Sequence, residues 1–324
     1  MGKELSFGLG VTLYSFNVEH YTYKYTMEEL LELVGSLGPA QGVELIGPQM
    51  IRSFPECSDE FEKRFKNAVE KYDLRPTCYG GYPDPQRVFG RWLTREEQSE
   101  YVKAQIRCAS KLGFRVIRIG CTKDLFVELV PYAEKYDVKM GIEIHAPMSI
   151  ENSGEMIDLI KKINSPYFGI IPDCGAFCST PGDVYINRFL EQGVPQNIVN
   201  KIIEMWNARI SEGEMRAEIG NMGGDELAMM MATESHMYFG HSDPKSMLAV
   251  MPYIVHMHGK FYNINENGEE SSVRYPEIVA TLQEANYSHY ISCEYEGHHW
   301  VPYGDSLSQI KGVQSLIRQL AEKN

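Results

Sequence analysis

The sequence lacks any long apolar run. A membrane-spanning helix needs about 18 or more consecutive apolar residues, and no such stretch occurs in the 324 residues of the chain. Residues 1–6 also lack the apolar run of a signal peptide. We therefore expect a soluble, cytoplasmic protein with no role for a membrane.

Paired cysteines and an excess of basic charge are missing as well. The seven cysteines are scattered and show no Cys-x-x-Cys spacing, which favours reduced thiols over a structural zinc site. Acidic residues outnumber basic residues by 44 to 31, for a formal net charge of -13. Because a protein that holds a phosphate backbone needs a basic face, nucleic acid is not expected as a partner.

The chain does have a regular alternation of short apolar runs and longer amphipathic segments. Eight runs are predicted to be strands, at residues 5–16, 42–47, 75–82, 115–121, 138–146, 168–175, 254–261 and 290–296. Between them, apolar residues recur at three- and four-residue spacing, which predicts helices at residues 27–37, 59–72, 95–112 and 124–136, among others. Thr26, Ser58 and Thr94 are expected to cap three of these helices.

Strands that alternate with helices are joined by crossovers and therefore run parallel. Eight such units close into a barrel, so the sequence predicts a single α/β domain over residues 1–324, a (β/α)8 TIM barrel. An open doubly wound sheet is the alternative fold. No predicted strand is followed by a glycine-rich phosphate loop, and we therefore expect no nucleotide cofactor.

One interval between strands is unusually long. The seventh predicted strand follows the sixth by about 80 residues, where the other intervals are about 25 to 40. Residues 176–252 are predicted to form a helical insertion at the catalytic rim, with helices at 196–212 and 225–235. The insertion is rich in methionine, which favours either the core of a small helical subdomain or an adaptable lid or partner-docking surface.

The last four predicted strands carry the residues that suggest chemistry. In a TIM barrel the active site lies at the carboxyl ends of the strands. An acid or a histidine stands at each of these positions: Glu143, Asp173, His256 or His258, and Glu294. Charges that converge there without compensation are costly to bury, and a divalent cation would satisfy all of them. An oxygen-rich set with one imidazole favours manganese, magnesium or cobalt over a structural zinc.

Further side chains join this predicted site because residues two apart on a strand share a face. His145 shares a face with Glu143 and is the candidate base, since the pKa of an imidazole lies near neutral pH. Lys260 is placed to steady a substrate oxyanion. The remaining candidates for contact with the substrate are His256, Glu296 and His298.

Structural roles compete with these interpretations. Glu44 lies inside the apolar run Val-Glu-Leu-Ile. Its position there is explained equally well by a salt bridge to a neighbouring Lys or Arg and by a functional role. A single histidine is usually a satisfied polar residue, and Cys174 and Cys178 are best explained as packed thiols. Four successive strands that each end in a ligand-type residue are harder to explain in this way, and they favour the metal site.

These residues resemble a known superfamily. The order Glu, Asp, His, Glu on strands five to eight, the Gly-Val-Glu-Leu of strand two and the His258-Gly-Lys260 triplet resemble the xylose-isomerase-like barrels, such as sugar isomerases, ketose 3-epimerases and inosose dehydratases. The resemblance covers nearly the whole chain except the long insertion. It implies four metal ligands, with His258 preferred over His256: Glu143, Asp173, His258 and Glu294.

The ketose epimerases in this superfamily also use the two ligand glutamates as acid and base, which implies catalytic roles for Glu143 and Glu294. This chain departs from their pattern at two positions. Ala176 stands where the epimerases have a histidine, and Ile264 stands where they have a substrate-binding arginine. Simple ketose epimerisation is therefore in doubt.

Within the superfamily, residues 11–16, residues 21–26, the Glu143-Ile-His145 triplet and the long insertion look most like the large subunit of bacterial C-glycoside deglycosidases. The resemblance implies manganese-dependent cleavage of the carbon–carbon bond between sugar and aromatic ring in 3-oxo-glycosides. It also implies a small β-sandwich partner subunit, and hence an oligomer. His145 would be the base, or the acid that protonates the aglycone.

Three other functions remain open from the sequence. An isomerase or 3-epimerase of a free or phosphorylated ketose shares the proton-abstraction step. An abasic-site endonuclease on the same barrel needs additional histidine ligands and a basic DNA track, which the charge of -13 argues against. A non-catalytic binding or scaffold subunit would keep its ligand after loss of the metal.

Overall fold

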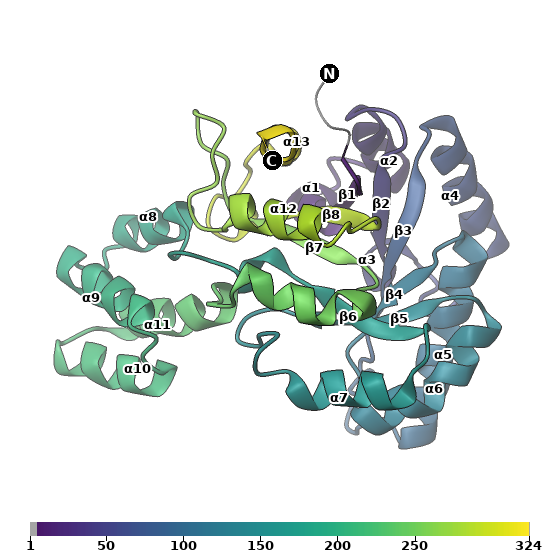
Figure 1. Cartoon of the computed structure of the whole chain (residues 1–324), viewed down its shortest axis with the longest axis horizontal. Helices are drawn as coiled ribbons and strands as arrows, with labels where there is room; N and C mark the ends of the chain where they lie inside the picture. Colours follow the sequence, from purple (N-terminus) through teal and green to yellow (C-terminus); the bar gives the residue numbers. More distant parts are fainter. Residues whose placement is uncertain (1–4, 324) are drawn as a thin grey trace.

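The protein, in a computed structural model that describes residues 5–323, is an eight-stranded parallel sheet rolled into a nearly closed barrel (Figure 1). The strands are β1 (Gly8–Thr12), β2 (Gly42–Ile46), β3 (Arg75–Gly80), β4 (Val116–Arg118), β5 (Lys139–Ile144), β6 (Phe168–Pro172), β7 (Met257–Phe261) and β8 (Tyr290–Tyr295). Their order in the sheet is β6-β5-β4-β3-β2-β1-β8-β7. Residues 1–4, part of the segment considered for a signal peptide, lie outside the described residues.

Two isolated bridges connect the chain at β6 with the chain at β7, the two edge strands of the sheet. They pair Ile170 with Ile254 and Asp173 with His258. The strands are short and apolar because both of their faces are covered: every residue of β2, β6 and β7 is buried. The predicted α/β TIM barrel is confirmed.

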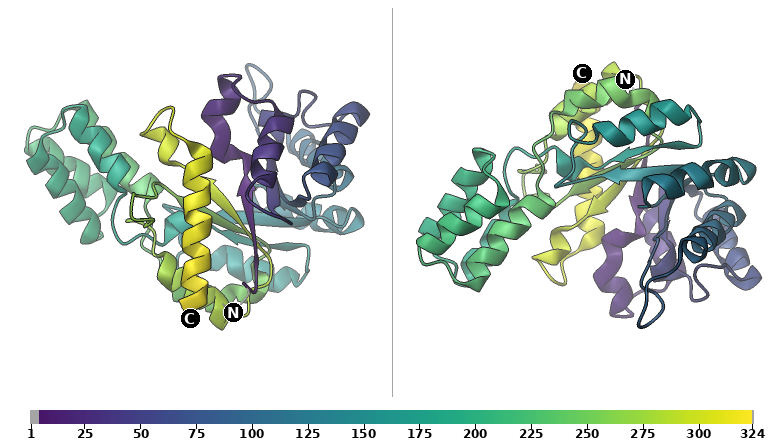
Figure 2. Two further views of the ribbon diagram at one scale, coloured as in Figure 1. Left: turned by 90° about the horizontal axis from the view of Figure 1, so that it is seen from above. Right: turned by 90° about the horizontal axis from the view of Figure 1, so that it is seen from below.

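Helices cover the outside of the barrel (Figures 1 and 2). They are α1 (Asn17–Tyr21), α2 (Met27–Gly35), α3 (Gly47–Met50), α4 (Asp59–Lys71), α5 (Arg95–Leu112), α6 (Lys123–Lys135), α7 (Gly154–Ile163), α12 (Tyr275–Glu284) and α13 (Ser306–Lys323). The caps at Thr26, Ser58 and Thr94 form as predicted, and Thr26 and Thr94 each complete a capping box with the glutamate three residues later. Among residues 5–323, no helix is both long and apolar enough to cross a membrane.

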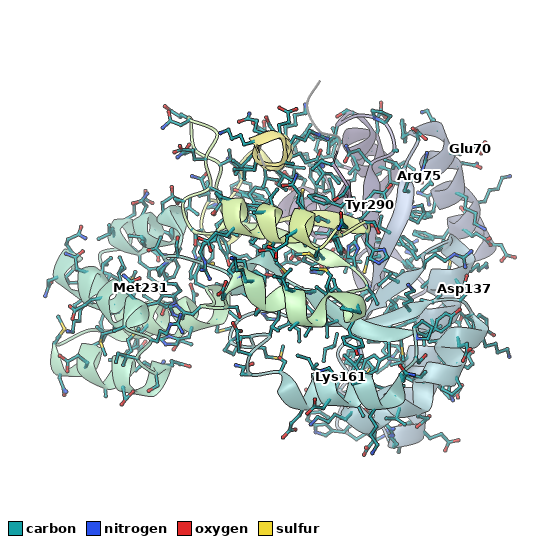
Figure 3. The ribbon with its side chains drawn as sticks, viewed as in Figure 1. Glu70, Arg75, Asp137, Lys161, Met231 and Tyr290 are labelled. Atoms are coloured by element: carbon teal, nitrogen blue, oxygen red, sulfur yellow. The ribbon has the colours of Figure 1, made fainter. Side chains whose placement is uncertain are left out.

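Four more helices lie between β6 and β7: α8 (Asp183–Glu191), α9 (Gln196–Asn207), α10 (Glu212–Asn221) and α11 (Glu226–Tyr238). They form a group that projects to one side of the barrel, and Met231 on α11 lies within it (Figures 1 and 3). Met231 is fully buried, whereas Met222, Met230 and Met237 are exposed. The methionines of this segment therefore contribute both to an internal core and to an open surface.

The base of this helical group is fastened to the residues that follow β6. Gly240 donates a backbone hydrogen bond to Gly175 and accepts one from Cys178, and the Ser242 amide donates to Ala176. A side chain at Gly240 would meet the backbone of Ala176 at 2.7 Å, so only glycine allows this close approach. The chain therefore leaves and re-enters the barrel beside Asp173.

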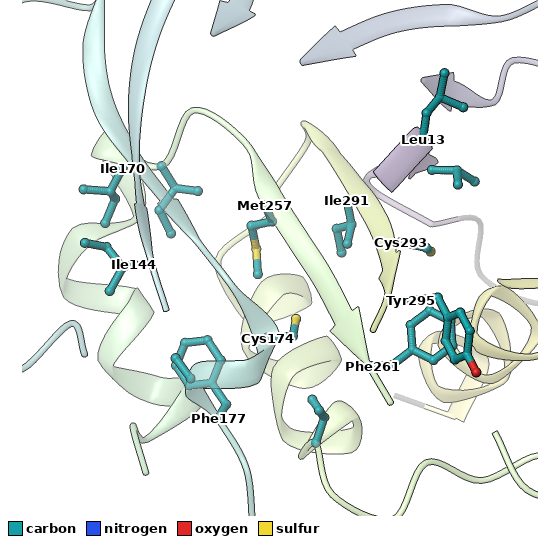
Figure 4. Close-up of a cluster of buried hydrophobic side chains, with 14 of the residues drawn as sticks. Leu13, Ile144, Ile170, Cys174, Phe177, Met257, Phe261, Ile291, Cys293 and Tyr295 are labelled. Carbon is teal, nitrogen blue, oxygen red and sulfur yellow. The ribbon is translucent and has the colours of Figure 1, made fainter. Parts of the chain in front are cut away.

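The main hydrophobic core lies between the strands and the surrounding helices. Figure 4 shows part of it, where Ile170, Met257 and Ile291 from three strands lie near Cys174 and Phe177. Short 3-10 helices connect several strands to this layer: η1 (Leu13–Phe16), η2 (Cys174–Ala176), η3 (Pro244–Tyr253) and η4 (Gly297–His299). This packed layer holds the strand ends, and the polar side chains on them, in fixed positions.

Candidate metal centre

The structure brings the four predicted ligands together. Glu143 lies in β5, Asp173 directly follows β6, His258 lies in β7 and Glu294 lies in β8. One potential ligand atom from each residue lies within 4.8 Å of those of the other three. The residues lie in or directly after four successive strands, β5 to β8, and an isolated bridge pairs Asp173 with His258.

The Nδ1 atom of His258 faces the three carboxylates. It lies 2.5 Å from Glu143 Oε1, 3.5 Å from Glu294 Oε2 and 3.9 Å from Asp173 Oδ2. Asp173 and His258 are 0% and 1% exposed, and Glu294 is 7% exposed. The site is therefore a small acidic group almost closed to water, and Glu143 has the most exposed side chain of the four, at 14%.

The Asp173 carboxylate is oriented by the backbone amide two residues later in the chain. Its Oδ1 atom accepts a hydrogen bond of 2.7 Å from the amide of Gly175 in η2. A Cβ atom at position 175 would collide with the side chains of Lys260, Tyr262 and Asp173, so this turn accommodates only glycine. The other oxygen, Oδ2, is thereby directed toward His258 and Lys260.

Two basic side chains compensate part of the negative charge. Lys260 Nζ lies 3.2 Å from Asp173 Oδ2, 3.2 Å from Glu296 Oε1 and 3.8 Å from Glu294 Oε2. Burial alone would lower the pKa of Lys260, but the surrounding carboxylates raise it well above its usual value. Arg118, at the end of β4, places Nη1 2.9 Å from Glu143 Oε2.

The donors fit a divalent cation. Asp173 Oδ2 and Glu294 Oε2 are buried and accept no hydrogen bond of normal geometry from residues 5–323. Burial raises the pKa of Asp173 to about 7. The Lys260 charge acts to lower this pKa, whereas the charges of Glu294 and Glu143 act to raise it. Burial likewise raises the pKa of Glu294. Crowded carboxylates with free oxygens beside one imidazole form the hard, oxygen-rich donor set that a cation would stabilise.

The other predicted residues lie around this group. His145 directly follows β5 and is half-buried, and no side-chain hydrogen bond to it is found among the described residues. Glu296 is buried and pairs with Lys260. His298 is half-buried, with its ring 5.5 Å from that of Tyr14. Their parts in catalysis and substrate binding stay predictions.

His256 lies deeper in the barrel. It is 2% exposed, and its Nε2 atom lies 2.8 Å from Ser292 Oγ and 3.6 Å from Glu44 Oε2. Glu44 is fully buried, and its ion-pair partners are His256 and His258 rather than the Lys or Arg considered from the sequence. Burial would raise the pKa of Glu44, but the two imidazoles hold it well below its usual range.

Arg118, Tyr82 and Tyr14 are site residues that the sequence did not reveal. Arg118 Nη2 donates to Tyr82 Oη at 3.0 Å, and its guanidinium lies over the Tyr82 ring, 5.1 Å from the centroid. The Tyr14 hydroxyl lies 3.1 Å from His299 Nε2. Burial, together with the charges of Glu296 and Glu294, raises the pKa of Tyr14. The one available signal was the arginine in the middle of the fourth predicted strand run, residues 115–121.

Comparison with known proteins identifies the family. The model of the xylose isomerase-like TIM barrel family matches residues 31–321. The chain belongs to this family. It is 34% identical to the 3'-dehydrocarminate deglycosidase alpha subunit of Microbacterium sp., an alignment that covers 96% of this chain and 94% of that protein. It is 33% identical to a C-glycoside deglycosidase alpha subunit of Arthrobacter globiformis, over 96% and 90% of the two chains.

Solved structures of xylose isomerase-like barrels share the fold at low sequence identity. A probable 3-DHS dehydratase of Bacillus anthracis matches with a TM-score of 0.56 and 13% identity, over 96% of this chain and 98% of that one. An L-ribulose 3-epimerase matches with a TM-score of 0.58 and 10% identity, over 98% and 95%. The predicted superfamily, the resemblance to deglycosidase alpha subunits and the expectation of an enzyme are confirmed.

Proposed function

We propose that the protein is the metal-dependent large subunit of a C-glycoside deglycosidase, which breaks the carbon–carbon bond of 3-oxo-C-glycosides. The observation that carries this proposal is the buried Glu143, Asp173, His258 and Glu294 cluster in a chain that matches deglycosidase alpha subunits over nearly its full length. One such relative is named for a dehydrogenated glycoside, which supports an oxidised sugar as substrate.

The four clustered side chains would hold the cation, with manganese preferred and magnesium or cobalt as alternatives. When bound, a divalent cation would supply Lewis-acid stabilisation for negative charge that develops on a substrate oxygen. Lys260 pairs with Asp173 and Arg118 pairs with Glu143, which offsets part of the negative charge of the cluster.

His145 is proposed as the base. A 3-keto group acidifies the proton on carbon 2 of the sugar, and the His145 imidazole, directly after β5, is proposed to accept it. The electron pair then forms the double bond between carbons 1 and 2, and the bond from carbon 1 to the aglycone breaks with its electrons on the aglycone carbon. That carbon takes up one proton, so an unsaturated keto sugar and the free aglycone result.

The residues beside the cluster are proposed to position the sugar. The Lys260 ammonium group has three N–H donors. It lies 3.2 Å from both Asp173 Oδ2 and Glu296 Oε1, so a third N–H can donate to a substrate oxygen. Glu296 Oε2 and His298 Nδ1 are buried and have no hydrogen-bond partner among the described residues. Sugar hydroxyl groups would satisfy both atoms.

The name "alpha subunit" of the relatives supports a second, small subunit for this chain as well. We propose a hetero-oligomer in the cytoplasm. The Met-rich helical group between β6 and β7 remains a candidate lid or docking surface for that subunit.

A ketose or sugar-phosphate isomerase or 3-epimerase is the alternative function. The similarity of fold to an L-ribulose 3-epimerase favours it. The side chains argue against it. Ala176 is almost fully buried and offers no polar group. Ile264 packs against Gly312 of α13.

Product analysis tests the proposal. The manganese-loaded chain, with and without its small subunit, is incubated with a 3-oxo-C-glucoside, and NMR follows the free aglycone and the unsaturated sugar. The proposal expects both products in equal amounts, and their loss after the metal is removed by a chelator. Isomerised ketose without release of aglycone would instead establish the epimerase.

A further inference from the structure

His258 presents its two ring nitrogens to two different groups of side chains. Nδ1 faces Glu143 and Glu294, at 2.5 Å and 3.5 Å. Nε2 lies 3.1 Å from Glu44 Oε2, on the opposite side of the ring. The residue is 1% exposed, so each nitrogen depends on a partner within the protein.

The position of Glu44 is determined by a local irregularity in the sheet. Between Val43 and Glu44 the pairing of β2 with β3 shifts register, because Val43 lies opposite Pro76 and Glu44 lies opposite Cys78. Such an irregularity changes the direction of the side chains that follow it. The Glu44 carboxylate is 0% exposed and faces the barrel interior, with His256 and His258 as its ion-pair partners.

A neutral imidazole that binds a cation through Nδ1 carries its proton on Nε2. A carboxylate at Nε2 accepts that proton in a hydrogen bond, fixes the tautomer and the ring plane, and makes Nδ1 a better donor. The 3.1 Å contact has this geometry. We propose that Glu44 is a positioning residue for the metal site: it holds the His258 ring with Nδ1 directed toward the cation.

This inference rests on the metal site of the proposed function, but it does not depend on the reaction. A different arrangement must be tested with it, because potential ligand atoms of Glu44, Cys78, His256 and His258 also lie within 4.8 Å of one another. A second cation there would need His258 to bridge two ions without a ring proton. It would also compete with Ser292 Oγ, which lies 2.8 Å from His256 Nε2. The positioning role requires neither change.

The test compares metal binding by the wild-type chain, Glu44→Gln and Glu19→Gln. Calorimetric titration with Mn²⁺ gives stoichiometry and affinity, and the visible spectrum of the cobalt form reports the ligand geometry. We expect one ion per chain in all three proteins, and an affinity about 10 to 100 times weaker in Glu44→Gln. Its cobalt spectrum should also change. Glu19 is a buried glutamate of α1, 6% exposed, that serves as the control with wild-type affinity.

Several results would overturn the proposal. These are wild-type affinity and an unchanged cobalt spectrum in Glu44→Gln, equal weakening in Glu19→Gln, or a wild-type chain that binds no ion. Two ions per wild-type chain, with one lost in Glu44→Gln, would replace it with a second metal site. A wild-type chain that binds one ion but releases no aglycone would contradict the proposed function. The effect of Glu44→Gln on metal affinity could still be interpreted in that case.

Discussion

Glu294 and Glu296 lie two residues apart on and after β8, yet the structure gives them different surroundings. Each has one buried oxygen without a hydrogen-bond partner among the described residues, but Glu294 lies 3.5 Å from His258 Nδ1, whereas Glu296 lies 3.2 Å from Lys260 Nζ. The account assigns the first to the cation and the second to the substrate. The two glutamates therefore form a matched pair for mutation.

We predict that Glu294→Gln lowers the affinity for Mn²⁺ at least tenfold and abolishes turnover, because it removes a charged ligand. Glu296→Gln should keep the metal affinity and raise the KM for the sugar, because it changes only a substrate contact. Metal titration and steady-state kinetics measure the two effects separately. Equal metal affinity in both variants would contradict the assignment, and circular dichroism confirms that each variant is folded.

The pH dependence of metal binding is a second prediction for these side chains. Burial, with the charges of Glu294 and Glu143, raises the pKa of Asp173 to about 7 in the absence of a cation. A cation needs the ionised carboxylate, so binding must displace a proton below that pH. The affinity for Mn²⁺ should therefore fall as the pH drops from about 7, by up to about tenfold per pH unit for each proton displaced.

Calorimetry at about pH 6 and about pH 8, in buffers with different ionisation enthalpies, counts these protons. The expected result is more proton release and weaker binding at the lower pH. Affinity that is the same at both values, in protein that remains folded, would show that the carboxylates are already ionised.

Among the strands and helices, the sequence indicated the fold reliably where a pattern was long and locally determined. The helix predicted at 95–112 coincides with α5, and its capping box at Thr94 forms, because both depend on residues close together in the chain. The first strand was predicted too long: β1 ends at Thr12, and residues 13–16 form η1, where the Thr12 side chain accepts from the amide of Tyr14. Apolar character alone cannot distinguish a strand from a buried helical turn.

The four candidate ligands could be predicted because each lies inside or just after one of the last four apolar runs. Arg118 could not, since its partners Glu143 and Tyr82 come from neighbouring strands and only the folded barrel brings them together. The same holds for Glu44, whose ionic partners lie more than 200 residues later in the chain. Neither α8 nor α10 was specifically predicted as a helix; they are only nine and ten residues long, and both pack against α9 and α11.

The helical group between β6 and β7 depends on a central tryptophan. Trp206 of α9 is 1% exposed, and its Nε1 donates to the carbonyls of Ser235 and Phe239. We predict that Trp206→Ala lowers the free energy of unfolding by about 3 to 5 kcal/mol. Hydrogen exchange should show early loss of protection in α9 and α11 while the barrel strands stay protected.

Trp92 provides the control for this variant because its side chain is 63% exposed. Trp92→Ala should change the free energy of unfolding by less than about 0.5 kcal/mol. If both variants lose the same stability, or if the barrel opens together with α9, the helical group is not a separately packed unit.

For the protein as a whole, the similarity to alpha subunits raises the question of what this chain can do alone. All four candidate ligands come from a single chain, so we predict that the isolated chain binds one cation. Release of aglycone should rise at least tenfold when the proposed small subunit is added, because the relatives are named alpha subunits. Native mass spectrometry and the product assay measure assembly and activity. Full activity of the isolated chain, or no assembly, would contradict this prediction.

The central claim is that a single divalent cation lies among Glu143, Asp173, His258 and Glu294. Anomalous diffraction from crystals of the protein grown with Mn²⁺ tests it most directly. The account predicts one peak per chain, bonded to His258 Nδ1 and to oxygens of the three carboxylates. A peak on the opposite side of the His258 ring, beside Glu44 and Cys78, or no peak in the barrel at all, would contradict it.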